Sequence, residues 1–245
     1  MIAALLVAGG VAVFVVCGAQ GGEAVGDVVA DPAGSAAPSH RSVPGASGAP
    51  GAVDAARSAL PAADPIWIER VAAESGIPER ALSAYATAAL TLAEEQPGCR
   101  IGWNMLAGIG QVESEHGSIN GSRLLASGET TPRIIGVPLD GSQFLATPDT
   151  DDGTIDGDTE WDRAVGPMQF IPSTWAMFGR DGNGDGRIEI DQIDDAALSA
   201  ATLLCDPGLD LTAGEHWIAA LDGYNPSVSY NNEVADAAER YAEFG

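Results

Sequence analysis

Apolar residues recur every three or four positions along most of the chain after residue 63. This spacing places them on one face of an α-helix, whereas strict alternation predicts a strand. Read with helix start and stop signals, the pattern predicts helices at about residues 65–75, 78–92, 102–116, 171–178, 194–204, 212–221 and 227–244. Strand signals are scarce, and only a short hairpin around residues 133–144 is predicted. The predicted fold class is mainly α, with an irregular acidic insertion.

Two helix starts carry capping signals. Asp64 is an N-cap residue that precedes Pro65 at the first helical position. Thr212 and Glu215 have the spacing of a capping box. The folded domain is therefore predicted to cover residues 64–245.

The residues before this domain have a different composition. Residues 1–16 are apolar and uncharged, so residues 1–19 are predicted to be an export signal peptide or a membrane anchor. Cleaved secretion, a retained anchor and a lipid-modified Cys17 are the alternatives, and each places the domain outside the cytoplasm. Residues 20–63 are rich in Gly, Ala, Pro and Ser, which predicts a disordered tether.

The net charge of the chain excludes some classes of binding partner. It has 35 acidic and 11 basic residues, all of the latter arginine, and a net charge of −24. Without a basic stripe to neutralise phosphates, nucleic acid is excluded as a partner. Adhesion to an anionic membrane surface through charge is excluded for the same reason.

Two of the three cysteines are candidates for a disulfide. Cys17 lies in the apolar N-terminal stretch, which leaves Cys99 and Cys205. Neither has a nearby Cys or His at zinc-ligand spacing. An exported chain favours a Cys99–Cys205 disulfide, and two buried thiols are the alternative.

A carboxyl group is predicted to face the core near the end of the third helix. Leu106, Ile109 and Glu113 share one helix face, whereas Glu115 points toward water. A carboxyl in an apolar cleft has a raised pKa and suits a general acid near neutral pH. The alternative is a helix-end glutamate that reaches solvent or pairs with an arginine. His116, at the helix end, is predicted to be a capping or surface residue outside the site.

Residues 181–192 begin like an EF-hand calcium loop. Oxygen-bearing side chains stand at positions 1, 3 and 5, and a glycine for the sharp turn stands at position 6. Many oxygen ligands in a flexible loop favour a structural Ca²⁺ over Mg²⁺. The candidate ligands are Asp181, Asn183, Asp185 and the backbone carbonyl of Arg187. Position 12 is Gln192, so the closing carboxylate is expected from Asp191, Asp194 or Asp195.

A second acidic cluster precedes this loop and lacks its order. It consists of Asp149, Asp151, Asp152, Asp156 and Asp158. A solvated loop is the favoured interpretation, and a weak second cation site is the alternative.

Two further segments carry groups that can bind a substrate. Pro167 and Pro172 fix the backbone on either side of Gln169, whose amide both donates and accepts hydrogen bonds. Such an amide can orient a carboxyl or a sugar N-acetyl group, and a proline-rich turn over a core is the alternative. Tyr224 and Asn225 lie at a predicted helix-to-helix turn, where they either face a cleft or serve the turn itself.

These motifs together resemble those of a lytic murein transglycosylase. The closest resemblance is to the membrane-bound type B group in its actinobacterial form, whose lysozyme-like, goose-type fold contains an EF-hand-like loop. The resemblance covers residues 64–244 and rests on residues 111–114, 164–175, 181–195 and 224–225. One departure is the order Gly-Pro-Met-Gln, where better-known members have Gly-Met-Pro-Gln.

The resemblance implies a reaction and residue roles. Glu113 would protonate the glycosidic oxygen between N-acetylmuramic acid and N-acetylglucosamine, then accept the C6 hydroxyl proton as a 1,6-anhydro ring closes. Ser114, Gln169, Tyr224 and Asn225 would bind substrate, and Asp195 would close the calcium loop. The implied partner is the peptidoglycan glycan strand, met in the cell envelope by a secreted or membrane-anchored monomer.

Two other functions are kept as alternatives. A hydrolytic muramidase would use a second carboxylate, as ordinary glycosidases do. Its candidates are Asp156, Asp158, Glu160 and Asp162. The other alternative is a non-catalytic, calcium-dependent glycan-binding protein of the envelope.

Overall fold

The structure is a computed structural model that describes residues 61–142 and 144–245. The predicted export segment 1–19 and nearly all of the predicted tether 20–63 lie outside these described residues. No helix of the described part is both long enough and apolar enough to cross a membrane.

Helices make up most of the described chain. They are α1 (Pro65–Ser75), α2 (Glu79–Glu95), α3 (Trp103–Ser114), the short 3₁₀ helix η1 (Ile119–Gly121), α4 (Pro172–Phe178), α5 (Ile193–Cys205), α6 (Gly214–Tyr224) and α7 (Val228–Ala242). Two small antiparallel pairs complete it, β1 (Arg123–Leu124) with β2 (Thr130–Thr131), and β3 (Ile135–Pro138) with β4 (Arg163–Val165). The prediction of a mainly α fold is confirmed.

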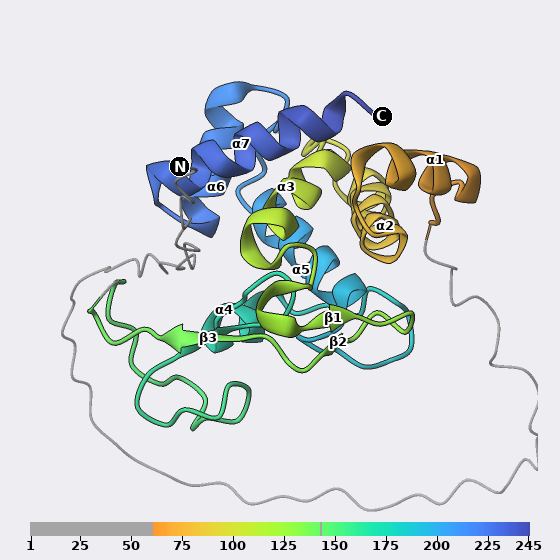
Figure 1. The fold of residues 1–245 in the computed structure, drawn as a ribbon. Helices are drawn as coiled ribbons and strands as arrows, with labels where there is room; N and C mark the ends of the chain where they lie inside the picture. The colour runs from red at the N-terminus through yellow and green to blue at the C-terminus, as the bar shows by residue number, and fades with distance from the viewer. Residues whose placement is uncertain (1–60, 143) are drawn as a thin grey trace, which may run out of the picture. The chain divides into compact units, whose positions relative to one another are not determined.

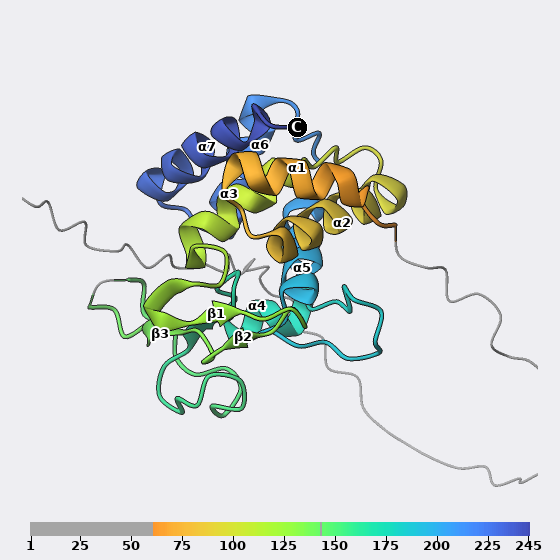
Figure 2. The ribbon, with the colours of Figure 1, turned by 45° about the vertical axis from the view of Figure 1, so that its right-hand side comes forward.

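The elements form two groups, which both ribbon views show (Figures 1 and 2). Helices α1, α2, α3, α6 and α7 lie together, and the strands, α4 and the irregular loops lie on the other side. Helix α5 connects them, because it packs against α2 and α6 as well as against α4. Helix α3 packs closely on α7, where a Cβ on Gly108 would lie 2.8 Å from the Val234 carbonyl oxygen.

Two details of the predicted secondary structure are wrong. The capping box does not form, because Asp210 accepts hydrogen bonds from both the backbone N–H and the hydroxyl of Thr212. Helix α6 therefore begins two residues later, after Ala213, which provides no side-chain cap. The predicted hairpin at residues 133–144 does not form either, because β3 pairs with β4 from beyond the acidic insertion.

A disulfide joins Cys99, in the loop after α2, to Cys205 at the end of α5. This confirms the predicted pairing. The two residues are separated by 106 positions, and both are buried. The backbone N–H of Leu211 donates to the carbonyl oxygen of Cys99, so the segment after α5 is held at the same place.

The disulfide gives a prediction for stability. Replacing both cysteines, Cys99→Ala with Cys205→Ala, should lower the free energy of unfolding by about 4–5 kcal/mol, since it frees a loop of this length in the unfolded chain. Urea unfolding followed by circular dichroism measures this change, with reduced wild-type protein as the comparison. A loss below about 1 kcal/mol would contradict the expected constraint on the unfolded state.

Candidate functional site

Glu113 lies in the last turn of α3 and is buried, with only 5% of its surface exposed. Its Oε1 accepts a hydrogen bond of 2.7 Å from the hydroxyl of Tyr230, and its Oε2 is buried without a hydrogen-bond partner. Burial raises the pKa of Glu113 to about 8, against the opposing effect of the Tyr230 hydrogen bond. The predicted orientation of Glu113 toward the core, with Glu115 exposed, is confirmed. At neutral pH this carboxyl largely retains the proton that a general acid needs.

Tyr230 was missed by the sequence reasoning. It lies in the first turn of α7, on the same buried face as Val234 and Tyr241. That spacing of i, i+4 and i+11 was a usable signal, because it marks the face that packs on another helix. The sequence did not show that α3 is that helix or that Glu113 lies opposite Tyr230.

Gln169 lies in a tight turn between β4 and α4. The turn is closed by hydrogen bonds of 2.8 and 3.0 Å between the backbones of Val165 and Phe170. Gly166 has a φ of +80°, and a Cβ there would lie 2.1 Å from the Ile190 carbonyl oxygen, so the turn requires glycine. Gln169 itself has a φ of +49° and is buried. Its Nε2 donates to the Gly166 carbonyl oxygen over 2.9 Å, so its amide is fixed in place.

Two other predicted site residues hold this turn. The hydroxyl of Ser114, next to Glu113, donates to the Pro167 carbonyl oxygen over 2.6 Å. The hydroxyl of Tyr224, the last residue of α6, donates to the Met168 carbonyl oxygen over 2.8 Å. Helices α3 and α6 therefore both bind the turn that carries Gln169. The structure thus brings together residues from three motifs that are far apart in the sequence.

Ser114 and Asn225 are buried, and their side chains make local hydrogen bonds. Ser114 also accepts from the backbone N–H of Gly117, so its hydroxyl is engaged on both sides. Asn225 accepts from the backbone N–H of Ser227, at the start of α7. In these contacts both residues position backbone, and their predicted contact with substrate stays a prediction.

His116 is not the capping or surface residue that the sequence predicted. It is 4% exposed and lies between two tyrosine hydroxyls, with Nδ1 3.1 Å from Tyr85 and Nε2 3.0 Å from Tyr241. The Tyr241 hydroxyl in turn donates to Gln111. Burial, and to a smaller degree Arg240, lowers the pKa of His116 to about 4. A neutral histidine therefore links α2 to α7, and Tyr241 continues the link to Gln111 in α3.

In the EF-hand-like loop, side-chain oxygens accept hydrogen bonds from the backbone N–H groups of the loop itself. Asp181 accepts from the backbone N–H groups of residues 184, 185 and 186. Asn183 and Asp185 accept from the backbone N–H groups of residues 185 and 187. The side chain of Arg187 pairs with Glu189, and a guanidinium has no acceptor atom for a metal. The candidate ligand at Arg187 is therefore its backbone carbonyl. All the donors are hard oxygens, and this set fits Ca²⁺.

Of the three candidates for the closing carboxylate, Asp195 is the one whose side chain contacts both ends of this loop. It is 1% exposed and accepts from the backbone N–H groups of Gly182 and Glu189, at the two ends of the loop. The other two candidates are engaged by arginines, Asp191 with Arg133 and Asp194 with Arg80. Gln192, at position 12, caps α5 by accepting from the Asp194 backbone N–H.

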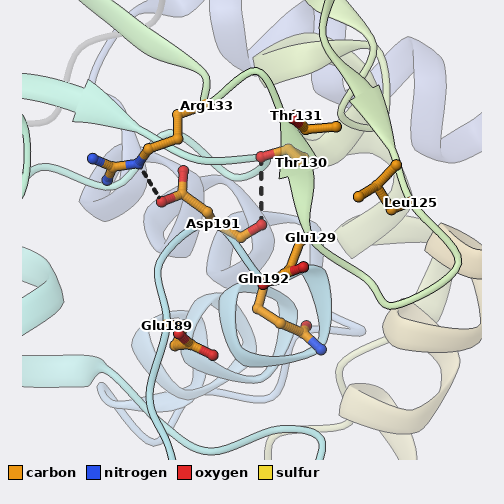
Figure 3. A pocket seen from close by; sticks show the side chains of 8 residues that line it. All are labelled: Leu125, Glu129, Thr130, Thr131, Arg133, Glu189, Asp191 and Gln192. Carbon is orange, nitrogen blue, oxygen red and sulfur yellow. Dashed lines mark hydrogen bonds and ion pairs between the residues drawn. The ribbon is translucent and has the colours of Figure 1, made fainter.

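A polar pocket of about 330 Å³ lies between the β1–β2 hairpin and the segment that leads into α5 (Figure 3). Arg133 and Asp191 form an ion pair in its wall, with Nε 2.6 Å from Oδ2. Its lining residues are Leu125, Glu129, Thr130, Thr131, Arg133, Glu189, Asp191 and Gln192. The pocket includes none of the predicted catalytic or substrate-binding residues.

Three of the four carboxylates considered for hydrolysis are engaged within the acidic insertion, and the fourth, Glu160, is exposed. Asp156 accepts from two backbone N–H groups, Asp158 pairs with Arg163, and Asp162 accepts from both the backbone and the hydroxyl of Thr150. Among the described residues, no second carboxylate is in hydrogen-bond contact with Glu113. The contacts of Glu113 are thus those of a single buried acid.

Comparison with models of protein families matches residues 149–224 to the family described as "Transglycosylase SLT domain". The match covers under a third of the chain and includes Gln169, the EF-hand-like loop and Tyr224, whereas Glu113, Ser114 and Asn225 lie outside it. The SLT domain is lysozyme-like, which confirms the predicted fold class. The match supports a lytic transglycosylase in general and does not distinguish the type B group. No curated protein and no solved structure matched the chain.

The raised pKa of Glu113 gives a prediction for the pH dependence of stability. Its pKa is about 8 in the folded state and 4.5 as the ordinary value, so the folded protein keeps a proton that the unfolded chain releases. The contribution of Glu113 to the free energy of unfolding should therefore fall as pH rises from about 4.5 to 8. This group should lower the free energy of unfolding of the wild type by ~3–5 kcal/mol between pH 5 and pH 9, and Glu113→Gln should lack this decrease.

Urea unfolding of both proteins across this pH range measures the effect. Every other titrating group is the same in the two proteins, so the difference between their curves reports on Glu113 alone. Parallel curves for wild type and Glu113→Gln would contradict the raised pKa.

Proposed function

We propose that the protein is a peptidoglycan lytic transglycosylase in which Glu113 is the only catalytic acid and base. The observation that carries this proposal is the state of its carboxyl group. One oxygen is fixed by Tyr230, and the other is buried and unpartnered, in a domain with partial similarity to the SLT family. A dry, protonated carboxyl with one oxygen free of hydrogen bonds is suited to give a proton to a glycosidic oxygen.

The reaction then needs no second protein carboxylate. Protonated Glu113 gives its proton to the oxygen that links C1 of N-acetylmuramic acid to N-acetylglucosamine, and the C1–O bond breaks. The N-acetyl group of the sugar stabilises C1 until the C6 hydroxyl oxygen attacks it. The carboxylate of Glu113 takes up the C6 hydroxyl proton, which restores the acid. A 1,6-anhydro ring forms at the new chain end, and no water is consumed.

The turn that carries Gln169 is proposed to orient the sugar or the acid. Its amide is buried and fixed by the Gly166 carbonyl, and the turn is bound by Ser114 and Tyr224. A group held in this way loses little conformational entropy when substrate binds. Asn225, at the α6–α7 junction, is proposed to bind substrate from the neighbouring helix end.

The EF-hand-like loop is proposed to hold a structural Ca²⁺. Asp181, Asn183, Asp185, the Arg187 carbonyl and Asp195 would be its ligands. A bound cation offsets the repulsion among these carboxylates and stabilises the folded state by mass action. The loop lies between the Gln169 turn and α5, so its stability bears on the site.

Peptidoglycan as substrate places the protein in the extracytoplasmic envelope. The finer assignment, to a type B-like enzyme that is secreted or membrane-anchored and monomeric, is also part of the proposal. It is supported by the embedded calcium-like loop and by the disulfide, which is typical of oxidising compartments.

The proposal predicts the effect of removing the acid. Glu113→Gln keeps the shape of the side chain but has no proton to transfer, so the rate of peptidoglycan digestion should fall by about 10²–10⁴-fold. Glu115→Gln is the matched control, because this neighbour is exposed, and its activity should equal that of the wild type. Mass spectrometry of the soluble products should detect 1,6-anhydromuramyl ends.

Other results would support the alternatives. Reducing ends without anhydro ends would identify a hydrolase. Binding of glycan strands without turnover by the wild type would identify a non-catalytic binding protein. Undiminished digestion by folded Glu113→Gln would remove Glu113 from the mechanism.

A further inference from the structure

Three carboxylates of the acidic insertion converge outside the EF-hand-like loop. Asp149 and Asp151 come from the loop before β4, and Asp162 comes from the residue directly before β4. One oxygen from each lies within 4.8 Å of the other two. Oxygens that share a Ca²⁺ at 2.3–2.6 Å are at most about 5 Å apart, so one cation can contact all three.

The three carboxylates of this triad are shielded from water to different degrees, with Asp149 and Asp151 partly exposed. Asp162 is fully buried, and the nearby Asp156 is 5% exposed. The Oδ1 atom of Asp151 is buried without a hydrogen-bond partner, although its Oδ2 accepts from the Ile155 backbone N–H. The predicted solvated loop is therefore wrong for Asp156, whereas Asp149 and Asp151 are partly exposed. An unpartnered carboxylate oxygen away from water is strongly disfavoured unless something neutralises it.

No side chain of the described part supplies that positive charge. The triad forms no ion pair with any arginine among the described residues. Arg163 is paired with Asp158, and Arg133 is paired with Asp191 while it donates to the Ile155 carbonyl. The chain contains no lysine. Burial, with repulsion from neighbouring carboxylates, raises the pKa of both Asp151 and Asp162.

We propose that Asp149, Asp151 and Asp162 form a second cation site, separate from the EF-hand-like loop, and that it takes Ca²⁺. The donors are carboxylate oxygens without nitrogen or sulfur, which favours a hard cation over zinc. The surrounding loop is irregular, and Ca²⁺ accepts irregular coordination where Mg²⁺ requires near-octahedral geometry. This inference does not depend on the proposed reaction.

The site has a structural consequence for the catalytic turn. Asp162 is followed by β4, and β4 leads directly into the turn that carries Gln169. The backbone of Asp162 is bonded on both sides, to Leu139 and to Thr147. A cation held by Asp162 therefore stabilises the strand from which the Gln169 turn begins.

The test uses a background in which the other site is disabled. The full chain with Asp181→Ala, which removes the side-chain ligand at the first position of the EF-hand-like loop, is freed of metal with a chelator. It is then titrated with CaCl₂ by isothermal titration calorimetry, and with MgCl₂ for comparison. Asp151→Asn is added in one protein, and Asp152→Asn, an exposed neighbour in the same loop, is added in the matched control.

The background protein and the Asp152→Asn control should each bind one Ca²⁺, and Mg²⁺ more weakly. Asp151→Asn should lower the Ca²⁺ affinity at least tenfold and abolish the rise of Tm on adding Ca²⁺. Without Ca²⁺, Asp151→Asn should unfold at the same or a higher temperature than its background, because it removes one of several repelling charges. This comparison separates loss of the site from loss of the fold.

Three results would overturn the inference. The first is no Ca²⁺ binding by the Asp181→Ala background. The second is an unchanged Ca²⁺ affinity in Asp151→Asn, and the third is a lower Tm of Asp151→Asn in the absence of Ca²⁺. The last would show that Asp151 is only a structural hydrogen-bond acceptor.

Discussion

The contact between α3 and α7 is the interaction on which the candidate site depends. It buries Glu113 and places the Tyr230 hydroxyl 2.7 Å from one of its oxygens. The close approach of the helices needs the small residue Gly108. The hydrogen-bond network around His116 also connects α3 and α7, because Tyr241 bonds both His116 and Gln111. Desolvation by this packing keeps the carboxyl protonated near neutral pH. A buried acid of this kind destabilises the fold at higher pH, a pattern typical of functional sites.

The rest of the domain positions one turn relative to that acid. The Gln169 turn has strained backbone at Gln169, whose φ is +49°, and it is held by side chains from α3 and α6. Such conformations persist only when the surroundings determine them. The buried Asp162 directly precedes the strand before the turn, and the segment after the turn leads through α4 to the EF-hand-like loop. Acidic loops therefore flank the turn on both sides, and cations bound there would stabilise its two ends.

Part of the excess of acidic residues is concentrated in the two acidic loops. Most of the carboxylates in the two loops accept backbone N–H groups or pair with arginine, so much of the charge is satisfied inside the loops. Three of them meet away from any arginine of the described residues. The net charge of −24 is thus partly a property of two specific loops and is not spread evenly over the surface.

Local signals in the sequence determined the helices, the direction of Glu113 and the opening of the calcium-like loop, because these depend on spacing within a few residues. The cap at Asp64 and the apolar stripe before Glu113 needed no distant partner. Tertiary structure alone decided what requires a partner far along the chain. It paired β3 with β4 across the insertion, placed Tyr230 on Glu113, buried His116 and brought Asp162 to Asp149 and Asp151. Periodicity tells which face of an element is buried, but the identity of the facing residue follows only from how the elements pack.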